Sequence, residues 1–489
     1  MKNIYKLTIA LSLFVGLFSC SEDYLNGELT SLATGSDVAK SPLAVEALLN
    51  GIYNFMVEYQ GSHDVFSYMS VQLAGDMMTE DVTMAMSHWF NYDNQIDNNG
   101  ATYRRVVYAW RTAYTIISSA NQVIAQIDPN TTDPEIAQML GQALTLRALG
   151  HHIAIQRFQQ TYKGHENAPG VPILLTGRDD DETNMGRGTV QQVYDRIFKD
   201  YLSAIALLEG HKRKAKFMVD QNVAAGLLAR AYMCVEDWNN AIKYAQMAYA
   251  GYSLMTAAEA GTDGYNNISN KEWIWGADIT GSNTSMFASY FSHFCSYDEG
   301  YGGAVGVFKV IDAKLFDQIS ATDSRRNLFK NETNAASLTG YPSGSNAPKG
   351  TNVKFKKVEG WLADYVFMRA SEMYLIEAEA LAHLGQGGPA ADVLKKLMQN
   401  RDPAWNRATV SVEDVFLQKR IELWGEGVIF YDYLRLKKGV DRTYQGSNHL
   451  YKVTRPAGDW LYIYQIPQAE IDNNEEISGD DQNPVTGIG

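Results

Sequence analysis

Cysteine is scarce in this chain of 489 residues. Its three cysteines are too few for a disulfide framework, and their spacing does not fit a metal site. We expect Cys234 and Cys295 to be small buried thiols, and the sequence leaves open whether they pair with each other. Clustered basic charge is also lacking. The formal net charge is −14 and is spread along the chain, which argues against a nucleic-acid partner.

Catalytic motifs are missing as well. The chain has no G-x-S-x-G, no H-E-x-x-H, no phosphate loop and no paired cysteine ligands, and we expect neither a cofactor nor a metal. The stretch Asp93–Gly100 has Asn98 where a calcium loop needs its glycine. A glycosidase needs only two carboxylates roughly 5–9 Å apart, and many Asp and Glu pairs could provide them. The sequence therefore leaves a surface glycoside hydrolase open as an alternative to a binding protein.

The N-terminus has the pattern of an export signal. Basic residues precede an apolar run over 7–18, which ends in Leu17-Phe18-Ser19-Cys20, and this sequence resembles a bacterial lipobox. We predict a signal peptide over 1–19, lipidation of Cys20 and a flexible tether over 20–40. Lipidation would anchor the protein through its acyl chains. No later run approaches the ~20 consecutive apolar residues of a membrane-spanning helix.

Paired amphipathic helices dominate the rest of the chain. The stretch 222–251 places two alanine-rich apolar stripes on either side of a very short turn, which predicts an antiparallel helical hairpin resembling a tetratricopeptide unit. A second hairpin of the same design is predicted from Asp364 to Met398. Further helices are predicted to start at Ser41-Pro42, to span 106–127, to run from Pro134 to about Gln159, to run from Thr189 to Leu208, and to span 412–424. The fold class is therefore mainly α, an α-solenoid of tetratricopeptide-like helical pairs.

The stretch from about Tyr252 to Gly360 differs from the helical parts. Gly, Ser, Asn and aromatic residues dominate it, and helical periodicity is weak except over 310–319. So long a non-periodic stretch is more often a functional surface than a connector. We predict one fold over 41–489, with an N-terminal helical part (41–251), a loop-rich ligand-binding insertion (252–363), and a C-terminal helical part with a tail (364–489). The tail is predicted to contain a short strand over 461–467.

These landmarks together resemble the SusD/RagB family, surface lipoproteins of Bacteroidetes that capture nutrients for an outer-membrane transporter. The resemblance covers nearly the whole chain. It is carried by the lipobox and tether, by 143–172 with its Pro169-Gly170-Val171-Pro172 turn, by 225–248, by Asp323-Ser324-Arg325-Arg326, by 369–380, by 420–427, and by 466–484. It implies a helical frame that supports an irregular ligand-binding half, and a SusC-type TonB-dependent barrel as the partner.

Aromatic rings set among amides and carboxylates suit sugar binding, because a ring covers the apolar C–H face of a sugar while polar groups bond its hydroxyls. The candidates in the first loop (74–100) are Trp89, Tyr92 and Asn94. Those in the second loop are Trp273, Tyr290, Phe291 and Tyr297. Several of these could be core residues instead, and for Trp273 burial on a strand is as well supported as exposure.

The resemblance implies an outer-membrane lipoprotein, facing the cell exterior, that binds oligosaccharides, delivers them to the barrel and catalyses no reaction. Capture of peptides, as in RagB-like members, is the first alternative. A scaffold that binds only proteins would explain the helical hairpins but would leave the aromatic half without a role.

Overall fold

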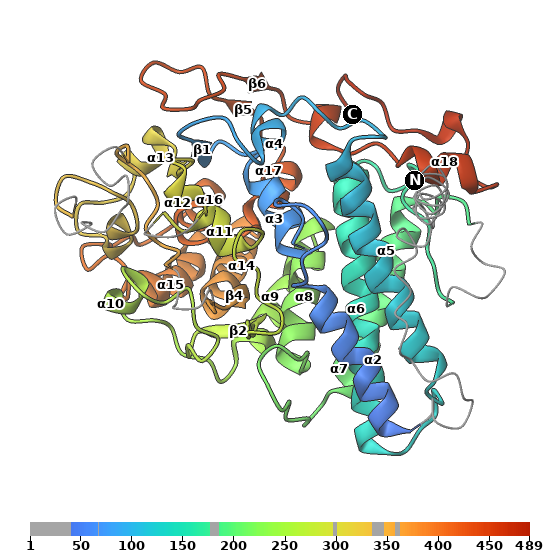
Figure 1. The fold of residues 1–489 in the computed structure, drawn as a ribbon. Coiled ribbons are helices and arrows are strands. Elements are labelled where there is room, and N and C mark those ends of the chain that lie inside the picture. Colours follow the sequence, from blue (N-terminus) through green and yellow to red (C-terminus); the bar gives the residue numbers. More distant parts are fainter. Residues whose placement is uncertain (1–40, 67, 177–184, 297–300, 335–346, 357–361) are drawn as a thin grey trace, which may run out of the picture.

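Long helices packed side by side form one half of the molecule (Figure 1). The structure, a computed structural model, describes residues 41–66, 68–176, 185–296, 301–334, 347–356 and 362–489. Each long helix packs against the next along the chain, and α2 lies across α5 and α6. The helices of this half are α2 (Pro42–Phe55), α5 (Arg104–Ala125), α6 (Pro134–Phe158), α7 (Val190–Leu207), α8 (Gln221–Cys234) and α9 (Trp238–Tyr249).

Side-chain caps set the start of these helices. The Ser41 hydroxyl accepts the Ala44 N–H at the start of α2, and the Asp133 carboxylate accepts two backbone N–H groups at the start of α6. Thr189 and Gln192 form a reciprocal capping box on α7. Such caps satisfy N–H groups that have no partner within the helix. The predicted starts of these three helices are confirmed.

The two predicted hairpins stack on each other. The α8–α9 hairpin packs against α14 (Ala370–His383), which pairs in turn with α15 (Gly387–Met398) and contacts α16 (Val412–Glu422). The Trp238 ring stacks on His383 with ring centroids 3.9 Å apart, and Tyr249 stacks on Tyr374 at 4.1 Å. One hairpin thus covers the apolar face of the next, which confirms the fold class of tetratricopeptide-like helical pairs.

Three two-stranded antiparallel ladders join distant segments. β1 (Val82–Met84) pairs with β3 (Lys309–Ile311), β2 (Trp273–Ala277) with β4 (Tyr365–Arg369), and β5 (Val440–Asp441) with β6 (Thr454–Arg455). The register places Val82 opposite Ile311, Trp273 opposite Arg369, and Val440 opposite Arg455.

The prediction that the second hairpin begins at Asp364 is wrong, because residues 365–369 form β4 and the helix starts at Ala370. These five residues are all buried against β2, and tertiary pairing overrides their helical periodicity.

Short elements make up the loop-rich parts of the chain. They are α3 (Tyr68–Asp76), α4 (Asn91–Gln95), α10 (Ala257–Ala260), α11 (Tyr290–Phe294), α12 (Tyr301–Ala304), α13 (Ala313–Asp317), η4 (Ser324–Leu328), α17 (Ile429–Arg435), η7 (Trp460–Tyr462), α18 (Gln468–Asn473) and η8 (Gly479–Asp481). The expected strand over 461–467 is wrong, since η7 occupies its start and the following residues pair with the long helices as described below. The three-part division of the chain stays a prediction.

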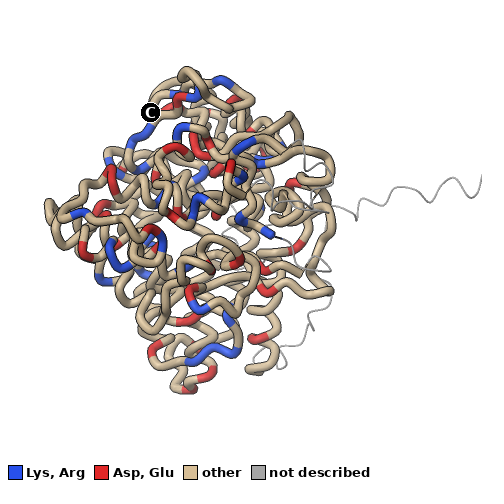
Figure 2. The backbone as a smooth tube through the Cα atoms, turned by 90° about the vertical axis from the view of Figure 1, so that its left-hand side faces the viewer, with Lys and Arg blue, Asp and Glu red and all other residues tan. Residues whose placement is uncertain are grey.

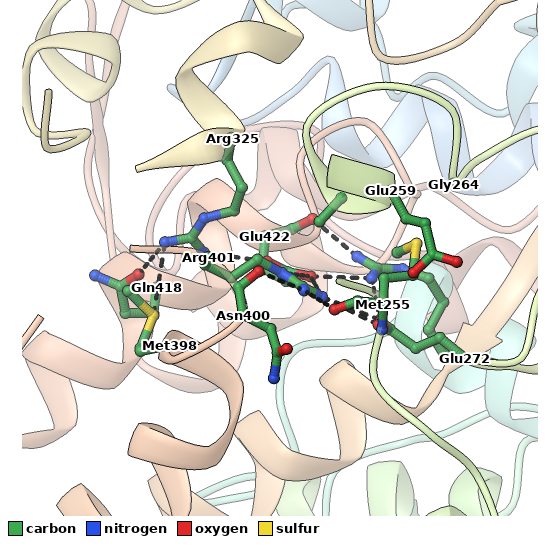
Figure 3. A network of polar contacts seen from close by, with 12 residues as sticks. Met255, Glu259, Gly264, Glu272, Arg325, Met398, Asn400, Arg401, Gln418 and Glu422 are labelled. Atoms are coloured by element: carbon green, nitrogen blue, oxygen red, sulfur yellow. Dashed lines mark hydrogen bonds and ion pairs between the residues drawn. The ribbon is translucent and has the colours of Figure 1, made fainter. Parts of the chain in front are cut away.

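A buried charge network fastens the loop-rich part to the C-terminal helices (Figure 3). The Glu422 carboxylate on α16 accepts hydrogen bonds from Arg325 at 3.1 Å, Arg369 at 3.0 Å and Arg401 at 2.9 Å. Arg369 and Arg401 also reach Glu272, just before β2. Although burial opposes ionisation, Arg401, Arg369 and Arg325 hold the pKa of Glu422 well below its usual value. Charges of both signs therefore balance inside the fold.

The C-terminal strap, residues 463–489, closes the ends of α5 and α6. The Tyr464 N–H donates to the Arg157 carbonyl at 2.8 Å, and the Gln465 N–H donates to the Asn99 carbonyl at 2.9 Å. The Asn483 amide donates to the Phe158 carbonyl at 2.6 Å. The bonds to Arg157 and Phe158 satisfy carbonyl groups at the C-terminal end of α6 that have no partner within the helix, and the bond to Asn99 ties the strap to the loop before α5.

Cys234 and Cys295 are both buried and are not joined by a disulfide, which answers the question the sequence left open. The predicted signal peptide, Cys20 and the tether lie outside the described residues. Within the described part of the chain, no helix is both long enough and apolar enough to cross a membrane.

Candidate functional site

Five aromatic rings meet at the surface where three loops and the start of a short helix converge. We call His63, His88, Trp89, Phe287 and Tyr301 the ring cluster. They come from the loop between α2 and α3, the loop after β1, the loop before α11, and the start of α12. Phe287 is 51% exposed, and the other four are partly exposed. Met86, 47% exposed, precedes His88 in the same loop.

His63 lies at the centre of the ring cluster. Its ring stacks on Trp89 at a centroid distance of 5.4 Å and an interplanar angle of 9°, and it lies 5.0 Å from Tyr301 and 6.3 Å from Phe287. His63 Nδ1 is 2.9 Å from the Phe287 carbonyl oxygen, and the Tyr301 hydroxyl is 3.4 Å from His88 Nε2. The arrangement is therefore one connected surface rather than five separate side chains.

Ion pairs fix the loops that carry the ring cluster. Asp64, next to His63, binds Arg104 at 2.6 Å and Arg105 at 2.7 Å, at the start of α5. The Arg104 guanidinium also lies 5.6 Å from the centroid of the Trp89 ring, a cation–π geometry. Phe90, directly after Trp89, has φ of 72° although it is not glycine. Such strained backbone persists only where surrounding contacts hold it, and it is common at functional sites.

Burial and nearby positive charge keep His88 and His293 neutral. Burial lowers the pKa of His293, under the cluster, to about 3, and the Lys309 ammonium lowers it further. Burial and Lys309 also lower the pKa of His88. Against the opposing effect of burial, Arg105 and Arg104 hold the pKa of Asp64 below its usual value. His88 and His293 are thus neutral imidazoles near pH 7, each offering both a donor and an acceptor.

Four of the residues predicted from the sequence to bind ligand are buried. Asn94 is 0% exposed, and its amide donates to the carbonyls of Met77 and Val82. Trp273 is 0% exposed, Tyr290 is 1% exposed and Phe291 is 3% exposed. The expectation that these four side chains face a ligand is wrong, because a ladder and an aromatic core enclose them.

The other three candidates lie in different surroundings. Trp89 is partly exposed and belongs to the ring cluster. Tyr92 is 49% exposed, but its ring packs against Tyr103 at 5.9 Å and is not in ring contact with the cluster. Tyr297 lies outside the described residues. His63, Phe287 and Tyr301 were not predicted, although the polar run Gly281-Ser282-Asn283-Thr284-Ser285 before Phe287 is a signal for an exposed ring.

An open pocket of about 240 Å³ lies between α2 and the end of β2. Tyr53, Phe217 and Phe367 line its apolar side, and Asn50 and Asn54 line its rim. The loop that lines one side of this pocket with Asp278, Thr280 and Asn283 continues to Phe287 of the ring cluster. Among the described residues, no group of His, Cys, Asp and Glu is arranged to hold a metal ion.

The fold and the site define a helical-repeat protein that carries a loop-built aromatic surface. Two family models match the chain. One, described as "Starch-binding associating with outer membrane", matches residues 28–233, and the other, the SusD family, matches residues 265–485. The chain belongs to the SusD/RagB family. A search of curated protein sequences found no significant match.

Solved structures agree with this assignment. A SusD-like carbohydrate-binding protein from Bacteroides vulgatus ATCC 8482 is 26% identical, with a TM-score of 0.79, and the match covers 90% of this chain and 98% of the other. A SusD superfamily protein from Bacteroides thetaiotaomicron is 24% identical, with a TM-score of 0.75 and coverage of 91% and 100%.

Surface glycan-binding protein A from Bacteroides thetaiotaomicron, solved in complex with laminarihexaose, is 17% identical to this chain. Its TM-score is 0.68, and the match covers 88% of this chain and 97% of the other. At this identity the likeness concerns the fold alone.

Proposed function

We propose that this protein captures oligosaccharides at the cell surface through the ring cluster and catalyses no reaction. The observation that carries the proposal is the cluster itself, in which exposed and partly exposed rings from four segments form one surface. Sugars bind such surfaces through their C–H faces while neighbouring amides, imidazoles and hydroxyls bond their hydroxyl groups. The carbohydrate-binding protein with the similar fold supports the same ligand class.

The state of the Asp64 carboxylate at the cluster supports binding without hydrolysis. Asp64 is already bonded to two guanidinium groups, and its pKa is held below the usual value. A general acid for glycoside cleavage needs the opposite, a carboxyl group whose pKa is raised. We therefore expect the purified protein to bind oligosaccharides without releasing reducing ends. Turnover that persists in a purified sample would place the protein among the glycoside hydrolases.

Phe287→Ala tests the site directly. Because a single aromatic contact with a sugar contributes on the order of 1 kcal/mol, we expect affinity to fall about fivefold in titration calorimetry. Tyr92→Ala is the matched control, since its ring has almost the same exposure but lies apart from the cluster. Equal losses in the two variants would move the site toward Tyr92, and binding of peptides alone would favour peptide capture.

We further propose that Cys20 is lipidated, that the protein sits on the outer face of the outer membrane, and that it delivers its ligand to a SusC-type TonB-dependent barrel. The lipobox-like end of the export signal and the family description support this location. Cys20→Ala should release the protein from the membrane fraction and abolish palmitate labelling. Co-purification of the wild-type protein with a barrel from detergent-solubilised outer membranes tests the partner.

A further inference from the structure

Lys309 in β3 is a buried lysine without a counter-ion. It is 1% exposed, and no side chain of the described residues bonds its ammonium group. Burial alone lowers its pKa to about 7, so the amine is about half charged at pH 7 and mostly charged at pH 6. Burying a charged amine without a partner is unfavourable, so a position like this calls for an explanation beyond packing.

The other buried lysines of the described chain are paired. Lys354 binds Glu426 and donates to the carbonyls of Glu422 and Trp424, both at 3.0 Å. Lys419 binds Glu379 at 2.5 Å and Asp432 at 3.1 Å. The fold therefore supplies carboxylates to its buried lysines elsewhere, and Lys309 is the exception.

Lys309 lies beneath the ring cluster. Its strand pairs with β1 so that Lys309 faces Met84, and the loop that carries His88 and Trp89 follows directly. Alternation along β3 places Lys309 on the face opposite Phe308 and Val310, which form a small separate core. The ammonium is close enough to His88 and His293 to lower the pKa of both.

Among the described residues, the charges around the cluster do not cancel. Arg104 and Arg105 pair with Asp64, and Arg105 also lies 3.4 Å from Asp93, so these four groups balance. Lys309 is left over. The protein as a whole has a formal net charge of −14, and both signs are interspersed along the side of the backbone shown in Figure 2. In the described part of the chain, the excess positive charge beneath the ring cluster is thus a local feature.

We propose that the ring cluster selects oligosaccharides that carry negative charge, as uronates or sulfate esters, because the uncompensated Lys309 ammonium lies behind the rings. This inference rests on the proposed function. A charge held in a low-dielectric interior is screened less than one at the surface, so it acts on a ligand that stacks on the rings without touching it. The rings provide the binding surface, and Lys309 provides the preference among sugars.

The test compares ligands that differ only in charge. Oligogalacturonate and its methyl ester have the same backbone, and a sulfated galactan oligosaccharide beside its desulfated form distinguishes sulfate from carboxylate. At pH 6, where Lys309 is mostly protonated, we expect the wild-type protein to bind at least one anionic form about tenfold more tightly than its neutral counterpart, with affinity falling as salt rises.

Lys309→Met should remove most of that preference and leave binding of the neutral forms unchanged. Lys309→Arg, which keeps the charge, should retain the preference. Lys199→Met on exposed α7 is the control, because it changes the net charge equally without touching the cluster.

Two results separate this inference from the proposed function. If the protein binds neutral oligosaccharides as tightly as anionic ones, and Phe287→Ala weakens both, the inference is wrong and the proposed function stands. If no oligosaccharide of either kind binds, the proposed function itself fails. A Lys309→Met protein that loses stability while keeping any preference for anionic sugars would make Lys309 a structural partner and overturn the inference.

Discussion

The network around Glu422 and the site of Lys309 beneath the ring cluster both bury charge, but among the described residues only the network pairs each charge with an opposite one. In the network, carboxylates from two elements face arginines from three segments, and every fully buried guanidinium in it has a carboxylate partner. Beneath the rings, Lys309 has none among the described residues. The comparison separates two uses of a buried charge. A balanced set specifies which segments join, whereas an unbalanced charge is available to a partner from outside.

Glu422→Gln should have the largest effect, because it removes the carboxylate at the centre of the charge network. Arg325, Arg369 and Arg401 would lose a shared carboxylate, and we expect the free energy of unfolding to fall by about 3–5 kcal/mol. Urea denaturation followed by tryptophan fluorescence measures the loss. Glu413→Gln is the control, since this carboxylate is 68% exposed and its pair with Lys438 should contribute less than about 1 kcal/mol. Similar losses in both variants would mean that the network does not stabilise the fold.

Replacing two buried lysines by methionine should give changes of opposite sign. Lys354→Met leaves Glu426 with one cationic partner fewer and removes a donor from the carbonyls of Glu422 and Trp424, so we expect a loss of about 2–3 kcal/mol. Lys309→Met removes an unpaired amine and should raise the free energy of unfolding by about 1 kcal/mol. Denaturation of the two variants side by side measures both. A loss in both would remove the contrast between the two regions.

Asp76, at the edge of the network around Glu422, is a buried acidic group that, among the described residues, lacks the cationic partners of the network carboxylates. Burial raises the pKa of this carboxyl to about 8, while one of its oxygens accepts the Gly427 N–H at 2.7 Å and the other has no partner. The unfolded chain releases this proton near the ordinary pKa of 3.8, so the Asp76 contribution to stability falls as pH rises from about 4 to about 8.

Asp76→Asn has no proton to release. We expect its advantage over the wild-type protein to grow across that pH range by at least about 1 kcal/mol, the equivalent of one pKa unit. Denaturation midpoints at pH 5 and pH 8 measure it, and a constant difference between the two proteins would contradict the raised pKa.

The helical frame could be predicted from the sequence because its signals are local. Ser41, Asp133 and Thr189 act as caps within a few residues of themselves, and apolar stripes mark each buried face. β4 could not be predicted, since its conformation depends on pairing with β2, almost a hundred residues away. Local propensity and distant pairing gave different answers there, and the pairing determined the structure.

The ring cluster could be predicted only in part. Trp89 was a candidate, but His63 and Tyr301 join it only because their loops meet in space. Tyr290 and Phe291 look like surface aromatics in a loop-rich stretch, yet a one-turn helix directs them into the core with Phe294 and Phe355. Composition indicated the stretch that carries Phe287 and Tyr301, and only tertiary contacts decide which rings face outward and bring His63, His88 and Trp89 beside them.

The C-terminal strap implies an order of assembly. A ribosome delivers α5 and α6 long before the strap, and until then the carbonyl groups of Asn99, Arg157 and Phe158 must be hydrated. A chain truncated before residue 463 would keep every long helix but would lack these hydrogen bonds. The strap is thus synthesised after both helices that it closes, and its docking completes their hydrogen bonding.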